Sequence, residues 1–485
     1  MVEDKNIGHS GETPLLEVKD FSLIFRHYGK GLRERDLEVV RNFNLTIHEG
    51  EIVAVLGASG SGKSLLANAI LGILPDNAVT SGTLNYKGAA LTEKKQALLR
   101  GKEISLIPQS VNALDPLMKT GKQVRTMIAR RNKKRVQQDI FKKVGLPDSA
   151  GDRYPFELSG GMARRVLIST SMAGNANLVI ADEPTPGLDP AVLQETVGQM
   201  RRLADAGKGM MFITHDIEIA LQIADKIAVF YEGETIEIAQ AGDFSGKGER
   251  LRHPYTRALW RALPKNDFIS LQPSAYSNSR KSGKPSLEIK GISYHYPNSS
   301  WLFKDLDLTV QPGEIVGVYG HSGSGKSTMA QVIAGYRTTL GGTVEIAGKT
   351  IPKKGRHPVQ MVWQHPEKAI NPRWRIKQTL QEAGEIDQKL LKTLGIRQDW
   401  LERWPSELSG GELQRFCLAR AMTGDTEYLV ADEITTMLDA VTQSQIWHSL
   451  IELADERGVG ILAISHDYHL LERVCDRIIH FDDLK

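Results

Sequence analysis

The chain has 485 residues, which is too long for one typical domain and predicts two large domains or several smaller ones. Its 41% hydrophobic and 25% charged residues are ordinary for a globular protein, and a net charge of +3 is too small to argue for nucleic acid as the main ligand. No apolar run approaches the roughly 20 residues that span a bilayer, the polar segment Met1–Pro14 does not look like a signal peptide, and the two cysteines, Cys417 and Cys475, fit a reducing compartment.

The first informative element is residues 52–56, a continuous apolar run that predicts a buried parallel strand. A glycine-rich segment follows and leads into a predicted helix. Glycines let backbone N–H groups wrap phosphates, Lys63 supplies positive charge, and the Ser64 hydroxyl is a ligand for Mg²⁺. The pattern predicts a phosphate loop made of Gly57, Ala58, Ser59, Gly60, Ser61, Gly62, Lys63, Ser64 and Leu65.

A helical insert without strand patterns is expected from about residue 123 to residue 171, followed by apolar strands at 178–180 and 211–213. Asp182 and Glu183 follow the first of these strands and His215 follows the second. The carboxyl ends of parallel strands meet at one edge of a sheet, so these side chains are expected beside the phosphates. We expect Asp182 to hold Mg²⁺, Glu183 to polarise the attacking water, and His215 to contact the γ-phosphate.

The second half repeats these motifs in the same order, which excludes a chance match. A polar segment rich in Ser, Lys and Pro separates the halves and predicts a flexible linker. The predicted domains are therefore residues 15–264 and 286–485, joined by residues 265–285. The repeated site residues are Gly320, His321, Ser322, Gly323, Ser324, Gly325, Lys326, Ser327, Thr328, Asp432, Glu433 and His466.

A Leu-Ser-Gly-Gly sequence precedes each Asp-Glu pair, at residues 158–161 and 408–411. With the phosphate loops, it resembles the signature of the ATP-binding-cassette (ABC) ATPases over nearly the whole chain. The resemblance implies an α/β fold of two tandem ABC-type P-loop domains. Each would have a mostly parallel core sheet, an antiparallel β part and a helical subdomain. It also implies an ATPase whose cofactors are ATP and Mg²⁺.

The same resemblance implies further roles. The two signature segments would each close over the ATP of the other half, so that the halves pair within one chain. Gln109 and Gln364 resemble the Q-loop glutamines that touch Mg²⁺, and Asp189 and Asp439 resemble the D-loop aspartates. Phe25 and Tyr296 are candidates to stack on adenine. The signature residues are Ser159, Gly160, Gly161, Ser409, Gly410 and Gly411.

Three features resemble the ATPases of oligopeptide, dipeptide and nickel importers: the tail at 253–264, the signature region at 154–162, and the two Q-loop regions at 109–116 and 364–372. This implies two transmembrane permease subunits and a solute-binding protein as partners, at the cytoplasmic face of the inner membrane. Pro186-Gly187 in the first D-loop and Ile434 after Glu433 depart from the family pattern. The tail has no cysteine cluster, so no iron–sulfur cluster is expected.

Two alternatives stay open. Tandem-cassette ATPases that act on ribosomes also have two halves, but a long charged helical linker joins them, unlike the short linker expected here. A sugar importer with a fused ATPase is closer in class, although one site is degenerate in many of those and both are complete here. The basic stretch from Arg125 to Lys143 fits a solvated helix face better than a lipid or permease contact.

Overall fold

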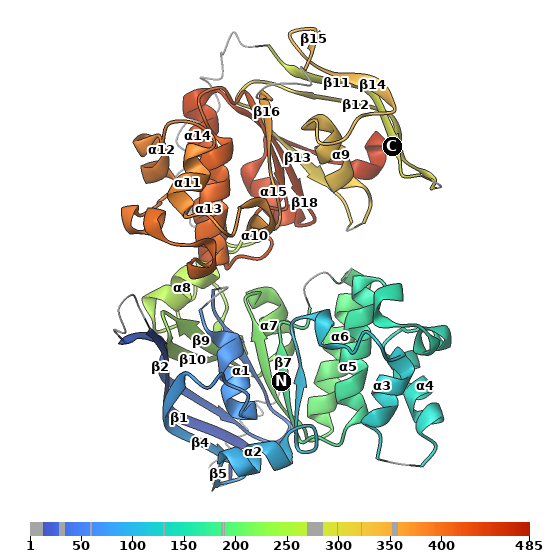
Figure 1. Cartoon of the computed structure of the whole chain (residues 1–485), viewed down its shortest axis with the longest axis vertical. Helices are drawn as coiled ribbons and strands as arrows, with labels where there is room; N and C mark the ends of the chain where they lie inside the picture. Colours follow the sequence, from blue (N-terminus) through green and yellow to red (C-terminus); the bar gives the residue numbers. More distant parts are fainter. Residues whose placement is uncertain are drawn as a thin grey trace. The chain divides into compact units, whose positions relative to one another are not determined.

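The computed structural model describes residues 13–28, 34–58, 61–129, 131–185, 188, 190–268, 285–297, 299–321, 323–351 and 357–485. The chain divides into a first unit, Met1–Thr256, and a second unit, Arg257–Lys485 (Figure 1). This division lies earlier in the chain than the boundary predicted from the sequence.

The first unit contains two sheets. An antiparallel sheet has the order β2-β1-β4-β5, and a core sheet has the order β10-β9-β3-β8-β7-β6. All neighbours in the core sheet are parallel except β9 and β10. The strands are β1 Leu16–Tyr28, β2 Glu34–Ile47, β3 Ile52–Leu56, β4 Ala78–Tyr86, β5 Ala89–Ala90, β6 Ile104–Ile107, β7 Leu178–Asp182, β8 Gly209–Thr214, β9 Lys226–Tyr231 and β10 Glu234–Gln240.

The predicted helical insert of the first unit consists of α3 (Thr120–Thr126), α4 (Lys133–Lys143) and α5 (Gly160–Ala173), with 3-10 turns between them. These helices lie together at one side of the core sheet (Figure 1). The predicted strands at 52–56, 178–180 and 211–213 are confirmed as β3 and parts of β7 and β8. The other helices are α1 Lys63–Leu71, α2 Glu93–Leu99, α6 Pro190–Asp205, α7 Ile217–Ile223 and α8 Pro254–Arg261, which crosses the division between the units.

The second unit repeats this plan with the sheets β12-β11-β14-β15 and β16-β17-β18-β13-β19, the latter fully parallel. Its strands are β11 Leu287–His295, β12 Trp301–Val310, β13 Ile315–Tyr319, β14 Gly341–Ile346, β15 Lys349–Thr350, β16 Val359–Val362, β17 Tyr428–Asp432, β18 Gly460–Ser465 and β19 Arg477–His480. Its helices are α9 Lys326–Ile333, α10 Pro366–Ala369, α11 Ile376–Gln381, α12 Gln388–Thr393, α13 Gly410–Ala421, α14 Ala440–Arg457 and α15 Tyr468–Val474.

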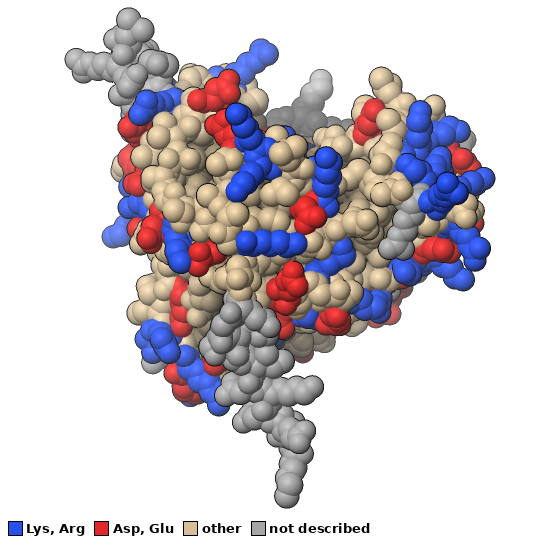
Figure 2. Space-filling view, turned by 90° about the horizontal axis from the view of Figure 1, so that it is seen from below, with Lys and Arg blue, Asp and Glu red and all other residues tan. Residues whose placement is uncertain are grey.

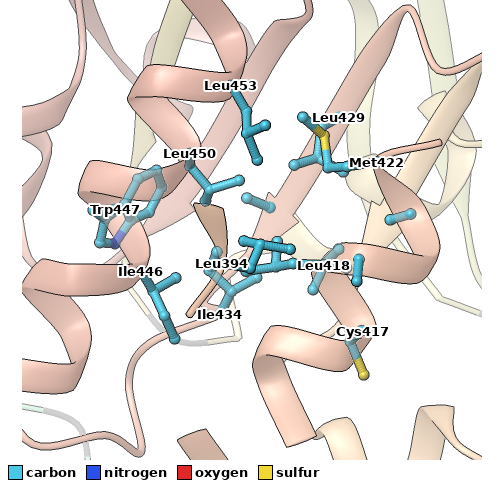
Figure 3. Packing of buried hydrophobic residues seen from close by; sticks show 14 of the residues in the cluster. Leu394, Cys417, Leu418, Met422, Leu429, Ile434, Ile446, Trp447, Leu450 and Leu453 are labelled. Carbon is cyan, nitrogen blue, oxygen red and sulfur yellow. The ribbon is translucent and has the colours of Figure 1, made fainter. Parts of the chain in front are cut away.

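A hydrophobic core joins the helical insert of the second unit to its parallel sheet. Figure 3 shows side chains from α13, β17 and α14 converging, with Leu418, Leu429 and Leu450 among them. Cys417 belongs to this core, and burial raises the pKa of its thiol to about 12. Cys417 is therefore a structural thiol of this core.

The start of the predicted linker packs on the second unit. The Phe268 side chain is buried, and its carbonyl accepts a hydrogen bond from Ser444 Oγ at 3.2 Å. The Arg473 guanidinium donates to the carbonyls of Pro264, at 2.8 Å, and Asn266. The polar composition of this segment did not predict the buried contact of Phe268. Residues 269–284 lie outside the described part of the chain.

In the first unit, Lys and Arg side chains gather where α4 lies, on the right of Figure 2. They are part of the basic stretch from Arg125 to Lys143. Among the described residues, no helix combines the length and the apolar character needed to cross a bilayer.

Candidate nucleotide-binding sites

The first phosphate loop connects β3 to α1. Gly62 has a φ of 97° and caps α1, a left-handed conformation that favours glycine. A Cβ on Gly57 would lie 2.4 Å from the Phe230 carbonyl oxygen, so only glycine fits there. Lys63 is buried, and its Nζ donates to the carbonyls of Gly57 at 2.7 Å and Ala58 at 2.6 Å. Leu65 lies in α1, whereas Ser59 and Gly60 lie outside the described residues.

The second phosphate loop has the same geometry between β13 and α9. Gly325 caps α9 with a φ of 112°, and Lys326 Nζ donates to the carbonyls of Gly320 at 2.7 Å and His321 at 2.8 Å. Gly323 also has a positive φ, of 80°. Ser322 lies outside the described residues.

Each loop buries one hydroxyl group without a hydrogen-bond partner in the described part of the chain, on Ser61 in the first and Ser324 in the second. A buried polar group without a partner is unfavourable, so it indicates a ligand that accepts its hydrogen bond. Together with a lysine and the N-terminus of a helix, these hydroxyls suit phosphate oxygens.

An aspartate lies beside each loop. Ser64 Oγ donates to Asp182 Oδ1 at 3.0 Å, and Ser327 Oγ donates to Asp432 Oδ1 at 3.2 Å. Hydroxyl and carboxylate oxygens in this arrangement fit a Mg²⁺ ion. Burial raises the pKa of Asp182, and it raises the pKa of Asp432 to about 6 although Ser327 opposes the shift.

Asp432→Asn is expected to stabilise the nucleotide-free second unit at pH 7 by about 1–3 kcal/mol. The folded pKa of Asp432 lies above the ordinary value of 3.8, so its ionisation destabilises the fold as pH rises through about 6. The gain should therefore shrink as pH falls from 6 and vanish below about 4. Thermal unfolding of both proteins in EDTA across this pH range measures the gain in stability. Asp182→Asn should act in the same direction in the first unit. An unchanged unfolding temperature at pH 7 would contradict the prediction.

A glutamate and a histidine pair in both units. His215 Nδ1 lies 2.9 Å from Glu183 Oε2, and His466 Nδ1 lies 3.2 Å from Glu433 Oε1. Both glutamates have a positive φ, 44° and 48°, which is strained for a residue other than glycine. The histidine side chains differ, because His215 is 11% exposed and His466 is 44% exposed.

The partners set the charge states of these pairs. Burial alone would raise the pKa of Glu183, but the hydrogen bond and charge of His215 outweigh it and hold that pKa low. Glu433 behaves in the same way beside His466. The hydrogen bond to Glu433 raises the pKa of His466, and the one to Glu183 raises the pKa of His215 against the effect of burial. Each unit therefore holds an ionised carboxylate beside its phosphate loop.

The two glutamines lie just after the edge strands β6 and β16. Gln364 Nε2 donates to Glu433 Oε2 at 3.1 Å. The backbone carbonyl of Gln109 accepts a hydrogen bond from Arg164 at 3.0 Å. Because β6, β7, β8 and β3 are neighbours, the first glutamine, the acidic pair, the histidine and the loop follow adjacent strand ends.

The signature serines cap the helices α5 and α13. Ser159 Oγ accepts from the Met162 N–H, and Ser409 Oγ accepts from the Glu412 N–H, both at 3.3 Å. Their glycines, Gly160 with Gly161 and Gly410 with Gly411, form the first turns of these helices. Asp439 caps α14, whereas Asp189 lies outside the described residues.

The two candidates for adenine stacking differ. The Tyr296 ring is 38% exposed, its hydroxyl lies 3.1 Å from Thr328 Oγ1, and Arg337 lies 5.2 Å from the ring centroid. Phe25 instead packs against the core cluster of the first unit. Tyr296 therefore lies beside α9, the helix that follows the second phosphate loop, and the role of either ring stays a prediction.

A family model described as ABC transporter matches residues 40–186 and 303–436, one stretch in each unit and more than half of the chain together. The chain belongs to the ABC transporter family. The glutathione import ATP-binding protein GsiA of Salmonella choleraesuis (strain SC-B67) is 29% identical over 535 residues, 96% of this chain and 84% of the relative. The uncharacterized ABC transporter ATP-binding protein YejF of Escherichia coli (strain K12) is 30% identical over 502 residues, 96% of this chain and 93% of that protein.

Among solved structures, an RNase-L inhibitor matches with a TM-score of 0.61 at 21% identity, covering 94% of this chain and 87% of that one. At this identity the match shows the fold alone. The expected fold of two tandem ABC units is thus confirmed, and the chain is an ATP-binding protein and an ATPase of the ABC transporter family.

The sequence motifs did not identify one residue at the first ABC site. Arg164, on the signature helix α5, contacts the backbone of both Gln109 and Glu183. Comparison of the two halves could have found it, because the second signature carries Gln414 at the matching place.

Proposed function

We propose that the chain is the ATP-hydrolysing subunit of a membrane importer for a peptide, a nickel chelate or a related small solute. The observation that carries this proposal is the match to GsiA along 96% of the chain, with a full set of ATP-site residues in both units. Glutathione is a small peptide, which agrees with the importer-like motifs at 253–264 and in the signature region.

The chemistry proposed for each site is attack of water on the γ-phosphate of ATP. Glu183 and Glu433 accept the proton of the attacking water, and His215 and His466 hold these carboxylates by hydrogen bonds. Lys63 and Lys326 exchange the loop carbonyls for phosphate oxygens when ATP binds. Ser64 with Asp182, and Ser327 with Asp432, would hold Mg²⁺, which would neutralise charge on the phosphates.

We further propose that each ATP is enclosed by the phosphate loop of one unit and the signature of the other. A serine hydroxyl, flexible glycines and a helix N-terminus form a second cradle for an anion. ATP would then hold the units together, and hydrolysis would release them.

Ser159→Arg should therefore impair ATP binding at the Lys326 site and spare the Lys63 site. A long cation at the start of α5 would block the approach to a γ-phosphate held by the second unit. Photo-crosslinking with an azido-ATP, followed by peptide mapping of the two loops, measures this. Ser409→Arg is the matched control, with the opposite pattern expected. Loss confined to the Lys63 site in Ser159→Arg would refute the pairing.

A cavity in the second unit is a candidate docking surface for a permease. It has a volume of about 370 Å³ and is lined by residues of the segment before Gln364, of α13, and of the region after α11. The lining includes Trp363, Cys417 and Arg420. We propose that a permease helix binds there. A change in the contacts of Gln364 at the ATP site would then be transmitted to the membrane subunit.

Copurification tests the importer role. The chain is extracted from membranes in mild detergent, and its partners are identified by mass spectrometry. Two hydrophobic permease subunits with a solute-binding protein support the proposal. Ribosomal proteins without a permease would favour a translation ATPase, and a sugar-specific permease would favour the second alternative.

A further inference from the structure

In the first unit, one side chain connects three parts of the ATP site. Arg164 lies on α5, the helix that begins at the signature serine. Its Nη1 donates to the Glu183 carbonyl at 2.7 Å, and its Nη2 donates to the Gln109 carbonyl at 3.0 Å. The planar guanidinium suits this double contact, because its donors are fixed in one fork. The signature helix, the Q-loop and the backbone of the glutamate are thus bridged by one group.

The second unit makes the corresponding connections in another way. Gln414 takes the place of Arg164, and within the described part of the chain its Nε2 donates to the Trp363 carbonyl, at 3.3 Å. The Glu433 carbonyl instead accepts from the backbone N–H of Thr436 at 3.2 Å. Gln364 also reaches Glu433 directly with its side chain.

The sequence explains why the first unit needs a different donor. The residue that matches Thr436 is Pro186, and proline has no backbone N–H. Pro186, which lies outside the described residues, therefore has no backbone N–H to offer. Among the described residues, Arg164 donates a hydrogen bond to the Glu183 carbonyl. The pair Arg164 with Pro186 therefore corresponds to the pair Gln414 with Thr436.

We propose that Arg164 is a positioning residue that fixes the Glu183 backbone to the Q-loop, so that hydrolysis at the first ATP site, unlike the second, depends on the signature-helix side chain. This rests on the proposed role of Glu183 as the residue that accepts the proton of water. Glu183 has a φ of 44°, a strained conformation that persists only where its surroundings hold it. Its N–H is held by the Ile213 carbonyl at 2.9 Å, and Arg164 holds its carbonyl.

The main test is the rate of the first turnover in the full chain carrying Glu433→Gln, in which hydrolysis depends on Glu183. Rapid-quench mixing with saturating ATP measures ADP formation, up to one per chain. Arg164→Gln is expected to slow this turnover about tenfold, since it leaves the carbonyl without its donor. The ATP concentration for half-saturation should stay unchanged, because Arg164 contacts no residue of the phosphate loop among its described hydrogen bonds.

The rescue variant separates positioning from general stabilisation of the fold. Adding Pro186→Thr to Arg164→Gln returns a backbone N–H to the sequence position that matches Thr436, and the rate should recover. Arg164→Lys should give an intermediate rate, because one ammonium group lacks the fork that reaches two carbonyls. The matched control is Arg202→Gln in the Glu433→Gln chain, where the first turnover should stay unchanged, because Arg202 is an exposed arginine on α6 that donates to Gln199 of its own helix.

Each outcome decides between the hypotheses. A normal first turnover in Arg164→Gln overturns the inference. So does a slow rate that Pro186→Thr leaves uncorrected while the unfolding temperature falls, since that pattern marks a structural role. Glu183→Gln in the same Glu433→Gln chain tests the proposed function separately, because a normal burst there would remove the role of Glu183 itself.

Discussion

A chain that carries both Glu183→Gln and Glu433→Gln is expected to bind ATP normally and to lose its turnover by a factor of about 10²–10⁴. Glutamine keeps the size and a hydrogen-bonding oxygen of each side chain but does not accept a proton from water. The loops proposed to hold the phosphates, with Lys63 and Lys326, are untouched. The prediction therefore separates binding from chemistry.

The measurement pairs steady-state phosphate release with binding of a fluorescent ATP analogue. Lys63→Ala with Lys326→Ala is the matched control and should lose binding as well as turnover, because the buried cations are removed from both loops. Normal phosphate release by the double glutamine variant would show that another group accepts the proton. Loss of binding in that variant would mean that the carboxylates support the loops rather than the reaction.

Much of each site follows from the order of motifs along the chain. Apolar strands such as residues 52–56 are recognisable without a structure, and residues directly after parallel strands meet at one edge of the sheet. This is why Asp182 and Ser64, far apart in the sequence, are hydrogen bonded. The pairing of His215 with Glu183 has the same origin, since β7 and β8 are neighbours.

Contacts made by long side chains across elements could not be predicted in this way. The reach of Arg164 to two carbonyls depends on how α5 packs beside the strand ends, which no local pattern encodes. The burial of Phe268 in a polar segment depends on tertiary packing in the same sense. Phe25 and Tyr296 show a further case, because both are aromatic residues in a first strand and only the environment distinguishes them.

Trp447 connects the core of the second unit to the loop that follows Glu433. Its ring is 2% exposed and packs in the cluster with Ile446, Leu450 and their neighbours (Figure 3). Its Nε1 donates to Thr435 Oγ1 at 3.1 Å, two residues after Glu433. The first unit has the smaller Val197 at the matching place, so this connection is specific to the second unit.

Trp447→Ala is expected to destabilise the second unit by about 3–5 kcal/mol, since it leaves a large cavity and removes a buried hydrogen bond. Urea unfolding followed by circular dichroism measures the loss, and hydrogen exchange should show lost protection in α14 and β17 but not in the first unit. Trp447→Phe fills most of the space and should cost clearly less. The half-exposed Trp404 is the matched control, and Trp404→Ala should cost about 1 kcal/mol or less, because its ring contributes mainly a contact with Arg375. Equal effects of the two alanine variants would mean that the core relaxes around the missing ring, and the loop that follows Glu433 would then not depend on Trp447.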